Sequence, residues 1–267
     1  MTMLFADLAL ARRLEHHEAR GLADYAYTQL ALEPQAQARV LRIGGGYAVF
    51  LGAGLLVNRA AGLGLTAAVS ASDLERIERF YEERQAPVAL ELCPLADSSF
   101  LELLGRRGYG IKKFYNVYAR SIFPSERLPP EAEVSVRPLN ADEADLWTAT
   151  VTDNPTSGPD PAIMKLAALA FNRPGVRCYL AELAGEPAGA AALYMREGLA
   201  SPMFAFTRPD FRRRGVQTAL LQARLAAAAR AGCDLATTTT SPPGNTSQRN
   251  LQRAGFGIVY TKMVMTR

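Results

Sequence analysis

Four arginines precede one glycine in the segment RPDFRRRGVQTALL, which begins at Arg208. The apolar residues after Gly215 recur at helical spacing, so a helix is expected to begin here and to end near Arg230. A helix start leaves about four N–H groups without partners and carries a partial positive charge, and glycine lets a ligand approach the backbone closely. Together with the guanidinium charges, these groups predict a turn that binds a diphosphate.

This turn differs from two other phosphate-binding loops. No Gly-Lys-Ser/Thr sequence follows it, as in nucleotide triphosphatases, and it lacks the G-x-G-x-x-G of dinucleotide folds. A solvated basic turn before a surface helix is the alternative for the same residues. A nucleic-acid site is the weaker alternative, because the net charge is only +4 and the aromatic residues nearby are Phe204, Phe206 and Phe211. We therefore expect no nucleic-acid partner.

Composition limits the remaining classes of protein. Of the 267 residues, 49% are hydrophobic and 21% charged, which suffices for one large domain or two modest ones. No apolar run reaches the ~18 residues of a membrane span, so no membrane partner is expected. Asp7 interrupts the first apolar stretch and arginines follow it, which differs from a secretory signal and predicts a cytoplasmic protein. Three separated cysteines and two histidines argue against zinc, haem, any other metal site and histidine-based triads.

An internal repeat organises the chain. The segment from Leu104 to Arg120 aligns without a gap with the segment from Leu251 to Arg267, and seven of the seventeen positions are identical. Two unrelated helix–glycine–strand units are the alternative to a duplication. Because each copy ends at an arginine, the first domain should close near Arg120, and the Pro-rich segment Ser121 to Glu133 should be the linker. The predicted domains are residues 1–128 and 129–267.

The second half alternates strands and helices. Period-two and helical spacings predict the order β-α-α-β-β-β-α-β-α-β between Val134 and the C-terminus, with Gly232 just past the end of the long helix. The strand from Leu199 to Thr207 runs into the arginine-rich turn. Cys178 and Cys233 are expected to be small buried side chains. Trp147 is expected in the core, and a place in the lining of the substrate cleft is the alternative.

From Val134 to Arg267 the chain resembles the GNAT acetyltransferase superfamily. The element order matches, the family signature R/Q-x-x-G-x-G/A corresponds to the residues from Arg212 to Gln217, and the opening VRPLNADEADLW and the closing helix–AGF–strand are also similar. With the repeat, the resemblance implies an α/β (α+β) protein of two tandem GNAT-like domains. Each would have a mixed, mostly antiparallel central sheet flanked by helices.

The resemblance also implies acetyl-CoA as cosubstrate. Backbone N–H groups from Arg213 to Thr218 would hold its diphosphate, and the main chain from Phe204 to Phe206 would pair with the pantetheine arm. The implied cofactor-binding residues are Phe204, Ala205, Phe206, Arg212, Arg213, Arg214, Gly215, Val216, Gln217, Thr218, Asn245 and Asn250. Two positions depart from the family pattern. Gln217 replaces a small residue, which the turn accommodates if the side chain points outward, and Leu251 stands where a tyrosine often protonates the leaving thiolate.

The remaining polar residues leave alternatives open. Asn245, Ser247 and Asn250 could contact the cofactor, or could only terminate a turn and cap a helix. No residue stands out as the general base; the candidates are Asp153, Asp160, Glu182 and Glu197, and a bound water is the alternative. The catalytic residues therefore stay unassigned.

The first half lacks a comparable basic turn. Its helix SDLERIERFYEE is expected to begin with a capping box of Ser72 and Glu75, whose side chains would occupy the amides and place carboxylates where a diphosphate would lie. We expect this domain to be degenerate and not to bind CoA. The function predicted for the chain is transfer of an acetyl group from acetyl-CoA to a small-molecule or peptide amine. A non-catalytic acyl-CoA-binding regulatory module is the alternative.

Overall fold

The computed structural model describes residues 4–126, 133–153, 158, 160–241 and 246–267. The chain forms two compact units. We call the unit of Met3–Tyr118, Thr239–Pro243 and Ile258–Arg267 the N-terminal unit, and that of Ala119–Thr238 and Gly244–Gly257 the C-terminal unit. Among the described residues, every helix is too short or too polar to cross a membrane.

The N-terminal unit is a mixed sheet with three helices. Its elements are α1 (Leu8–Leu32), β1 (Arg39–Ile43), β2 (Gly46–Phe50), β3 (Arg59–Ala61), α2 (Ala71–Glu82), β4 (Ala89–Leu92), α3 (Ser98–Arg106), most of β5 (Gly110–Ser121) and most of β11 (Gly257–Thr266). The strand order is β1-β2-β3-β4-β11-β5. All pairs with a defined register are antiparallel except β3 with β4.

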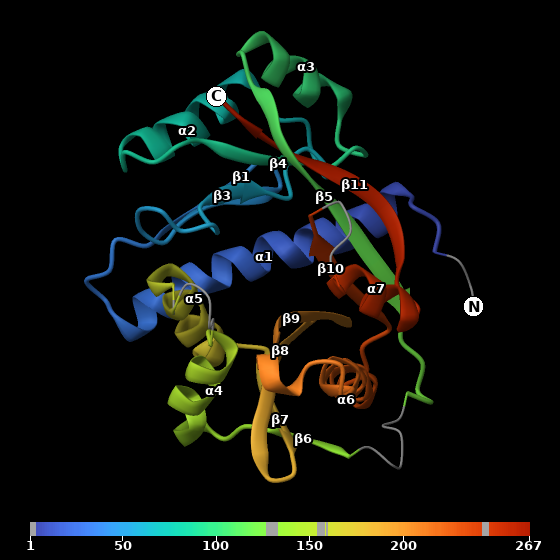
Figure 1. Ribbon diagram of the computed structural model, residues 1–267. Helices are drawn as coiled ribbons and strands as arrows, with labels where there is room; N and C mark the ends of the chain where they lie inside the picture. Colours follow the sequence, from blue (N-terminus) through green and yellow to red (C-terminus); the bar gives the residue numbers. More distant parts are fainter. Residues whose placement is uncertain (1–3, 127–132, 154–157, 159, 242–245) are drawn as a thin grey trace. The chain divides into compact units, whose positions relative to one another are not determined.

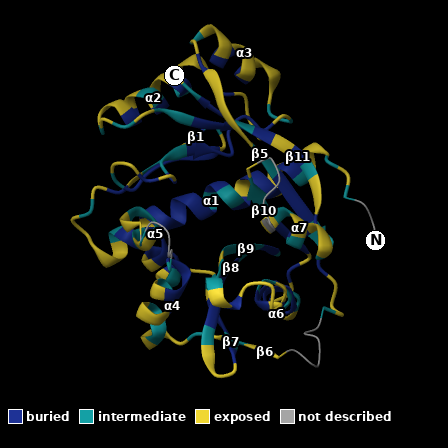
Figure 2. Cartoon of the chain, in the orientation of Figure 1, coloured by how far each residue is buried: buried dark blue, intermediate teal, exposed yellow. Residues whose placement is uncertain are grey.

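The core of this unit lies against α2 and α3. Leu74, Ile77 and Tyr81 follow one another at helical spacing on the buried side of α2, while its other side is exposed (Figure 2). Phe100 of α3 and Met265 of β11 belong to the same apolar cluster. The last strand of the chain therefore contributes to the core of the first unit.

The C-terminal unit contains the remaining elements. They are β6 (Val134–Pro138), α4 (Ala144–Val151), α5 (Pro161–Asn172), β7 (Val176–Leu183), β8 (Glu186–Arg196), β9 (Leu199–Thr207), α6 (Val216–Arg230), β10 (Leu235–Thr240, which leaves the unit at Thr238) and α7 (Thr246–Arg253) (Figure 1). Strands β6 to β9 are antiparallel neighbours, and β9 pairs with β10 in parallel. The predicted element order and the mixed, mostly antiparallel sheet are confirmed.

Small residues bring α6 close to the sheet. Ala188, Ala190, Ala191 and Ala192 of β8 are fully buried. A Cβ at Gly189 would lie 2.5 Å from the carbonyl oxygen of Phe206 and 2.9 Å from Cγ1 of Val216. Because these contacts leave no room for a side chain, glycine here fixes the first turn of α6 against β8 and β9.

The two repeat copies have the same local structure but different partners. Each is a helix, a glycine with positive φ and a strand; φ is 76° at Gly108 and 86° at Gly255. Strand β11 pairs antiparallel with β4 and lies next to β5, as the red and green ribbons of Figure 1 show. The domain division at 128/129 remains a prediction; the compact units differ from it because β11 pairs with strands of the N-terminal unit.

Candidate functional site

The first turn of α6 has backbone donors without partners in the helix. Gly215 is the N-cap residue, with φ of 80° and no capping side-chain hydrogen bond. The first helical bond runs from the N–H of Ala219 to the oxygen of Gly215, 2.9 Å away, so the three amides from Val216 to Thr218 have no helical acceptor. A Cβ at Gly215 would meet no described atom within 4 Å. The helix start is therefore open to an anion.

Arginines line the approach to this helix start. Arg212, Arg213 and Arg214 are exposed, and Arg213 adopts a left-handed φ of 63°. Arg208 is held more firmly, because its Nη1 donates to the oxygen of Pro187 at 3.0 Å. The guanidinium groups of Arg208 and Arg214 lie 5.6 and 5.8 Å from the ring centre of Phe211. These charges reinforce the positive end of the helix.

Gln217 does not point freely outward. It is half-buried, and its Nε2 donates to Oγ1 of Thr207 at 3.0 Å. The side chain thus ties the first turn of α6 to the end of β9, where the family pattern has a small residue. A glutamine fits this position because it finds a polar partner on the strand.

Strand β9 contains a bulge next to the helix start. Ala192 is opposite Met203 and Ala190 is opposite Phe206, so Phe204 and Ala205 together face one residue of β8. Phe204 has φ of 48°, and Ala205 is exposed. A bulge bends its strand and turns backbone groups away from regular pairing. The residues expected to contact the pantetheine arm are therefore the irregular part of this strand.

Strands β9 and β10 pair only where they begin. The register joins Leu235 to Leu199 and Ala236 to Ala200. Further along, Oγ1 of Thr238 donates to the oxygen of Pro202 at 3.3 Å. No ladder pair with β10 involves the part of β9 that contains the bulge. The backbone there is available to a ligand that lies along the strand.

The candidate acids and bases mostly have structural partners. Asp160 caps α5 by accepting from the N–H of Ala162 at 2.8 Å. Asp153 lies 3.6 Å from Nε of Arg208, and Glu182 lies 3.6 Å from Nε of Arg137. Glu197 is exposed and lies 3.2 Å from Nε of Arg196. None of these contacts singles out one carboxylate as the base.

Helix α7 supplies fewer of the expected contacts. Asn245 lies outside the described residues. Asn250 is half-buried on α7, and Ser247 is exposed. Leu251 is buried, with 7% of its surface exposed. Its side chain is thus part of the packing at the position where a tyrosine would supply a proton.

The expected core residues are buried. Trp147 is 0% exposed, and burial raises the pKa of Cys178 to about 12 and also raises the pKa of Cys233. Neither thiol is therefore a reactive thiolate near neutral pH. No three or more His, Cys, Asp or Glu side chains in the described ranges form a group that could hold a metal ion.

In the N-terminal unit, side chains occupy the start of α2. The capping box is formed by Ser70 and Asp73, so the prediction of Ser72 and Glu75 was wrong: the N-cap residue lies two residues earlier. The hydroxyl of Ser70 accepts from the N–H of Asp73 at 3.1 Å, and the carboxylate of Asp73 accepts from the N–H of Ser70 at 3.1 Å. A carboxylate thus lies at this helix start, where its negative charge would oppose an anionic ligand.

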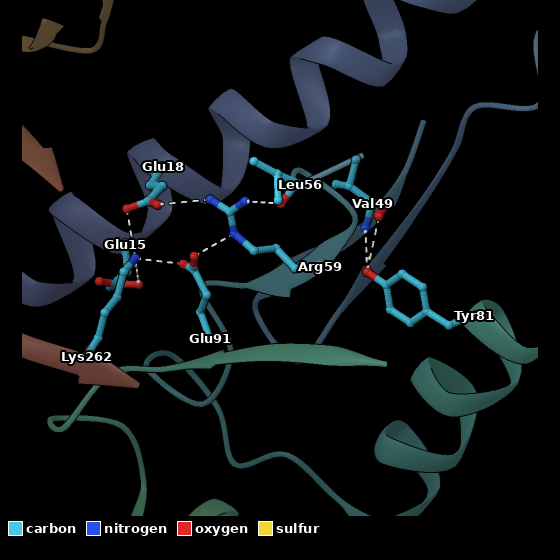
Figure 3. A network of polar contacts seen from close by, with 8 residues as sticks. All are labelled: Glu15, Glu18, Val49, Leu56, Arg59, Tyr81, Glu91 and Lys262. Carbon is cyan, nitrogen blue, oxygen red and sulfur yellow. Dashed lines mark hydrogen bonds and ion pairs between the residues drawn. The ribbon is translucent and has the colours of Figure 1, made fainter. Parts of the chain in front are cut away.

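The same unit contains a buried network of charges that the sequence did not predict (Figure 3). Nζ of Lys262 donates to Glu15 at 3.2 Å, to Glu18 at 2.8 Å and to Glu91 at 2.7 Å, and Arg59 also contacts Glu18 and Glu91. Burial raises the pKa of Glu15 to about 7, with Lys262 opposing the shift. Burial would also raise the pKa of Glu91, but Arg59 and Lys262 lower it to about 2.

The acetyltransferase (GNAT) family matches residues 143–256, a range that includes the β9 bulge and the start of α6. Residues 143–256 are therefore similar to GNAT acetyltransferase domains. The resemblance stated from the sequence is thereby confirmed, and acetyl transfer is the general activity of that family.

Solved structures support the same fold over most of the chain. A GCN5-related N-acetyltransferase from Kribbella flavida has a TM-score of 0.63 at 20% identity, covering 93% of this chain and 94% of its own. One from Sphaerobacter thermophilus has a TM-score of 0.56 at 17% identity, covering 86% and 75%. A tandem GNAT protein from the clavulanic acid biosynthesis pathway has a TM-score of 0.54 at 14% identity, covering 72% and 66%. The predicted tandem GNAT-like fold is confirmed. No curated protein matches the chain significantly.

The sequence missed one residue of the GNAT domain that contacts the bulged strand. Arg224 of α6 is 2% exposed and donates to backbone oxygens of β8 and β9. One signal was available: Arg224 lies between the apolar positions Leu220 and Ala227 on a helix whose buried residues are mostly alanine and leucine. An arginine within such a stretch indicates a buried polar contact.

Proposed function

We propose that the GNAT domain binds acetyl-CoA, with the diphosphate on the amides at the start of α6, and transfers the acetyl group to an amine. The observation that carries this proposal is the uncapped helix start: Gly215 offers open space, and the amides of Val216 to Thr218 have no helical acceptor. The exposed arginines from Arg212 to Arg214 supply positive charge beside these amides. Such a group of donors matches a diphosphate in charge and in hydrogen bonding.

The bulge of β9 supplies the contacts to the rest of the donor in this proposal. The main chain from Phe204 to Phe206 pairs with the pantetheine arm, and the amide near Ala205 polarises the thioester carbonyl. Both ends of the donor would then be held by neighbouring segments, since Gln217 ties α6 to Thr207 at the end of β9. Holding the thioester in one orientation favours direct attack by the amine.

No side chain is assigned as the general base. The amine loses its proton to water or to a carboxylate once the site has desolvated it, because desolvation lowers the pKa of an amine. Asn245 and Asn250 remain proposed donor contacts. We further propose that the N-terminal unit does not bind CoA, because Ser70 and Asp73 occupy the start of α2. The acceptor in this proposal is a small-molecule or peptide amine.

One observation favours a second candidate, an acyl-CoA-binding module without catalysis. Leu251 is buried where a proton donor for the leaving thiolate is often found. Such a module would bind acetyl-CoA through the same helix start and would turn over no amine. Release of free CoA from acetyl-CoA, measured across a panel of amines, distinguishes the two: stimulated release supports the transferase, and its absence with intact binding supports the module.

The binding proposal is tested by removing two guanidinium groups. Arg212→Gln combined with Arg214→Gln should raise the Kd for acetyl-CoA by about 10-fold or more, measured by isothermal titration, because two charges beside the diphosphate are lost. Arg230→Gln is the matched control, since Arg230 is exposed in the last turn of the same helix. An unchanged Kd in the double variant would remove this turn from the donor site.

A further inference from the structure

Arg224 is a buried cation that has no carboxylate partner among the described residues. It lies in the middle of α6 and is 2% exposed. Its Nε donates to the oxygen of Leu220 at 3.0 Å, and its Nη1 donates to the oxygens of Ala192 at 3.2 Å and Met203 at 3.3 Å. Within the described part of the chain, all three acceptors of this guanidinium are backbone oxygens. The side chain therefore joins a helix to two strands through hydrogen bonds to the backbone.

The two strand acceptors border the bulge of β9. Ala192 and Met203 form the last regular pair before Phe204 and Ala205, which together face a single residue of β8. Phe204 has φ of 48°, a left-handed conformation that is strained for a bulky residue and persists only when its surroundings fix it. Arg224 contacts the backbone at the residue just before this one.

Stability alone does not explain an arginine at this position. Burial disfavours the charged form and lowers the pKa of Arg224 to about 10. Replacing a buried charge by a well-packed apolar side chain of similar volume is often neutral or stabilising. What an apolar side chain would lose is the Nη1 group, which donates to Ala192 and Met203 and fixes them relative to α6. The gain from this arginine is therefore in the geometry of the strand.

We propose that Arg224 is a positioning residue that holds the β9 bulge in the conformation that presents the amide near Ala205 to the thioester carbonyl of the acyl donor. This inference rests on the proposed function. The same helix that offers its first-turn amides to the diphosphate also fixes, about two turns further along, the strand that contacts the acyl end. Both donor contacts are thus set by α6.

Arg224→Met is the direct test, with Arg230→Met as the control on the same helix. If Arg224 positions the bulge, the variant should bind acetyl-CoA about 10-fold more weakly, since one hydrogen bond to the carbonyl is lost. Binding of free CoA should weaken less, because free CoA has no thioester carbonyl. The Kd for free CoA divided by the Kd for acetyl-CoA should therefore be lower in the variant than in the wild type. A general loss of folded protein would weaken both ligands equally and leave this ratio unchanged.

A second readout needs no ligand. Trp147 is the single tryptophan of the chain, is fully buried, and packs against the ring of Phe204 with 5.8 Å between ring centres. Its indole N–H has no hydrogen-bond partner among the described residues. A relaxed bulge should therefore increase acrylamide quenching of Trp147 in Arg224→Met and leave it unchanged in Arg230→Met. Arg224→Lys keeps the charge but has one ammonium in place of the two guanidinium nitrogens that bond to α6 and to the strands, and should show an intermediate effect on both readouts.

The outcomes separate this inference from the function on which it rests. Wild-type protein that does not bind acetyl-CoA overturns the proposed function. Wild-type binding, with an unchanged Kd ratio and unchanged quenching in the variants, overturns the role of Arg224 alone. If Arg224→Met does not fold, the decision falls to Arg224→Lys: a wild-type Kd ratio in that variant counts against the inference.

Discussion

The two units differ in the partners of one helix start and of one buried cation in each. In the N-terminal unit, the start of α2 is closed by Ser70 and Asp73, and the buried ammonium of Lys262 contacts three carboxylates. In the C-terminal unit, the start of α6 has no side-chain cap, and the buried guanidinium of Arg224 contacts only backbone oxygens. Among the described residues, acidic side chains of the N-terminal unit meet both its α2 start and its buried ammonium, whereas no acidic side chain meets the α6 start or the buried guanidinium.

This difference indicates where a ligand would add stability. A donor that is already paired gains little from an anion, whereas an unpaired one gains a charge-assisted hydrogen bond. Helix starts of the same sheet-and-helix fold can therefore either bind an anion or oppose it, and a few side chains decide which. The contrast can be tested by breaking the paired network in one unit and by closing the open helix start in the other.

The largest effect is expected from Lys262→Met. The substitution leaves Glu15 and Glu91 buried without their ammonium partner, and removing one member of a buried ion pair costs about 3–5 kcal/mol. The free energy of unfolding, measured by urea denaturation, should fall by this amount. Lys112→Met, at an exposed position of β5, should change it by less than about 0.5 kcal/mol. Equal values for the two variants would mean that the network contributes nothing.

Closing the start of α6 should have the next largest effect. Asp73 is the third residue of α2, and Thr218 holds the same position in α6, where it is exposed. Thr218→Asp should raise the Kd for acetyl-CoA about 10- to 100-fold, because its carboxylate repels the diphosphate and accepts from the amides. The same charge favours the helix, so the free energy of unfolding should rise by about 0.3–1 kcal/mol.

Thr218→Asn is the control for this substitution, because it has nearly the same shape without the charge. It should bind acetyl-CoA within about threefold of the wild type, since a neutral amide adds no repulsion. The difference between Asp and Asn should shrink as salt is added. If both variants weaken binding equally, shape rather than charge is responsible, and the comparison with α2 fails.

Local signals explain why the helix start was predictable. A glycine, the arginines before it and the helical spacing after it lie within one short segment, so no distant partner was needed to locate the turn. The order of strands and helices followed from the same kind of local period. The cap of α2 was misplaced because serine occurs at both residue 70 and residue 72, and only the structure shows which one ends the extended backbone.

Long-range pairing explains why the network was not predictable. Lys262 contacts Glu15 and Glu91, which lie 247 and 171 residues away in the sequence. No periodicity connects such positions, and the repeat placed β11 with the second half of the chain. Arg224 was missed for a related reason. Its two acceptors on the strands are backbone oxygens 32 and 21 residues away, and every residue type has a backbone oxygen, so the sequence does not identify them.

The smallest effect concerns the pH dependence of the paired network. Burial raises the pKa of Glu15 from 4.5 to about 7, with Glu18 and Glu91 adding to the shift and Lys262 opposing it. Because the folded state holds this proton more tightly than the unfolded chain, the stability from Glu15 is fully present below pH 4.5 and is lost as the pH rises through about 7. Glu15→Gln removes this contribution while keeping an acceptor for Tyr260, which donates to Glu15 at 2.9 Å.

The free energy of unfolding of Glu15→Gln, relative to wild type, should therefore rise by about 1 kcal/mol between about pH 6 and pH 8. Glu91 does not titrate between pH 6 and pH 8, because its pKa is lowered to about 2. Its contribution to stability is lost only in acid. Glu102→Gln, exposed on α3, controls for the general loss of a negative charge. A difference that stays flat with pH would mean that Glu15 is ionised throughout. The attraction between Lys262 and the Glu15 carboxylate would then outweigh the effect of burial on the pKa of Glu15. The contrast with Arg224, whose described acceptors are backbone oxygens, would become sharper.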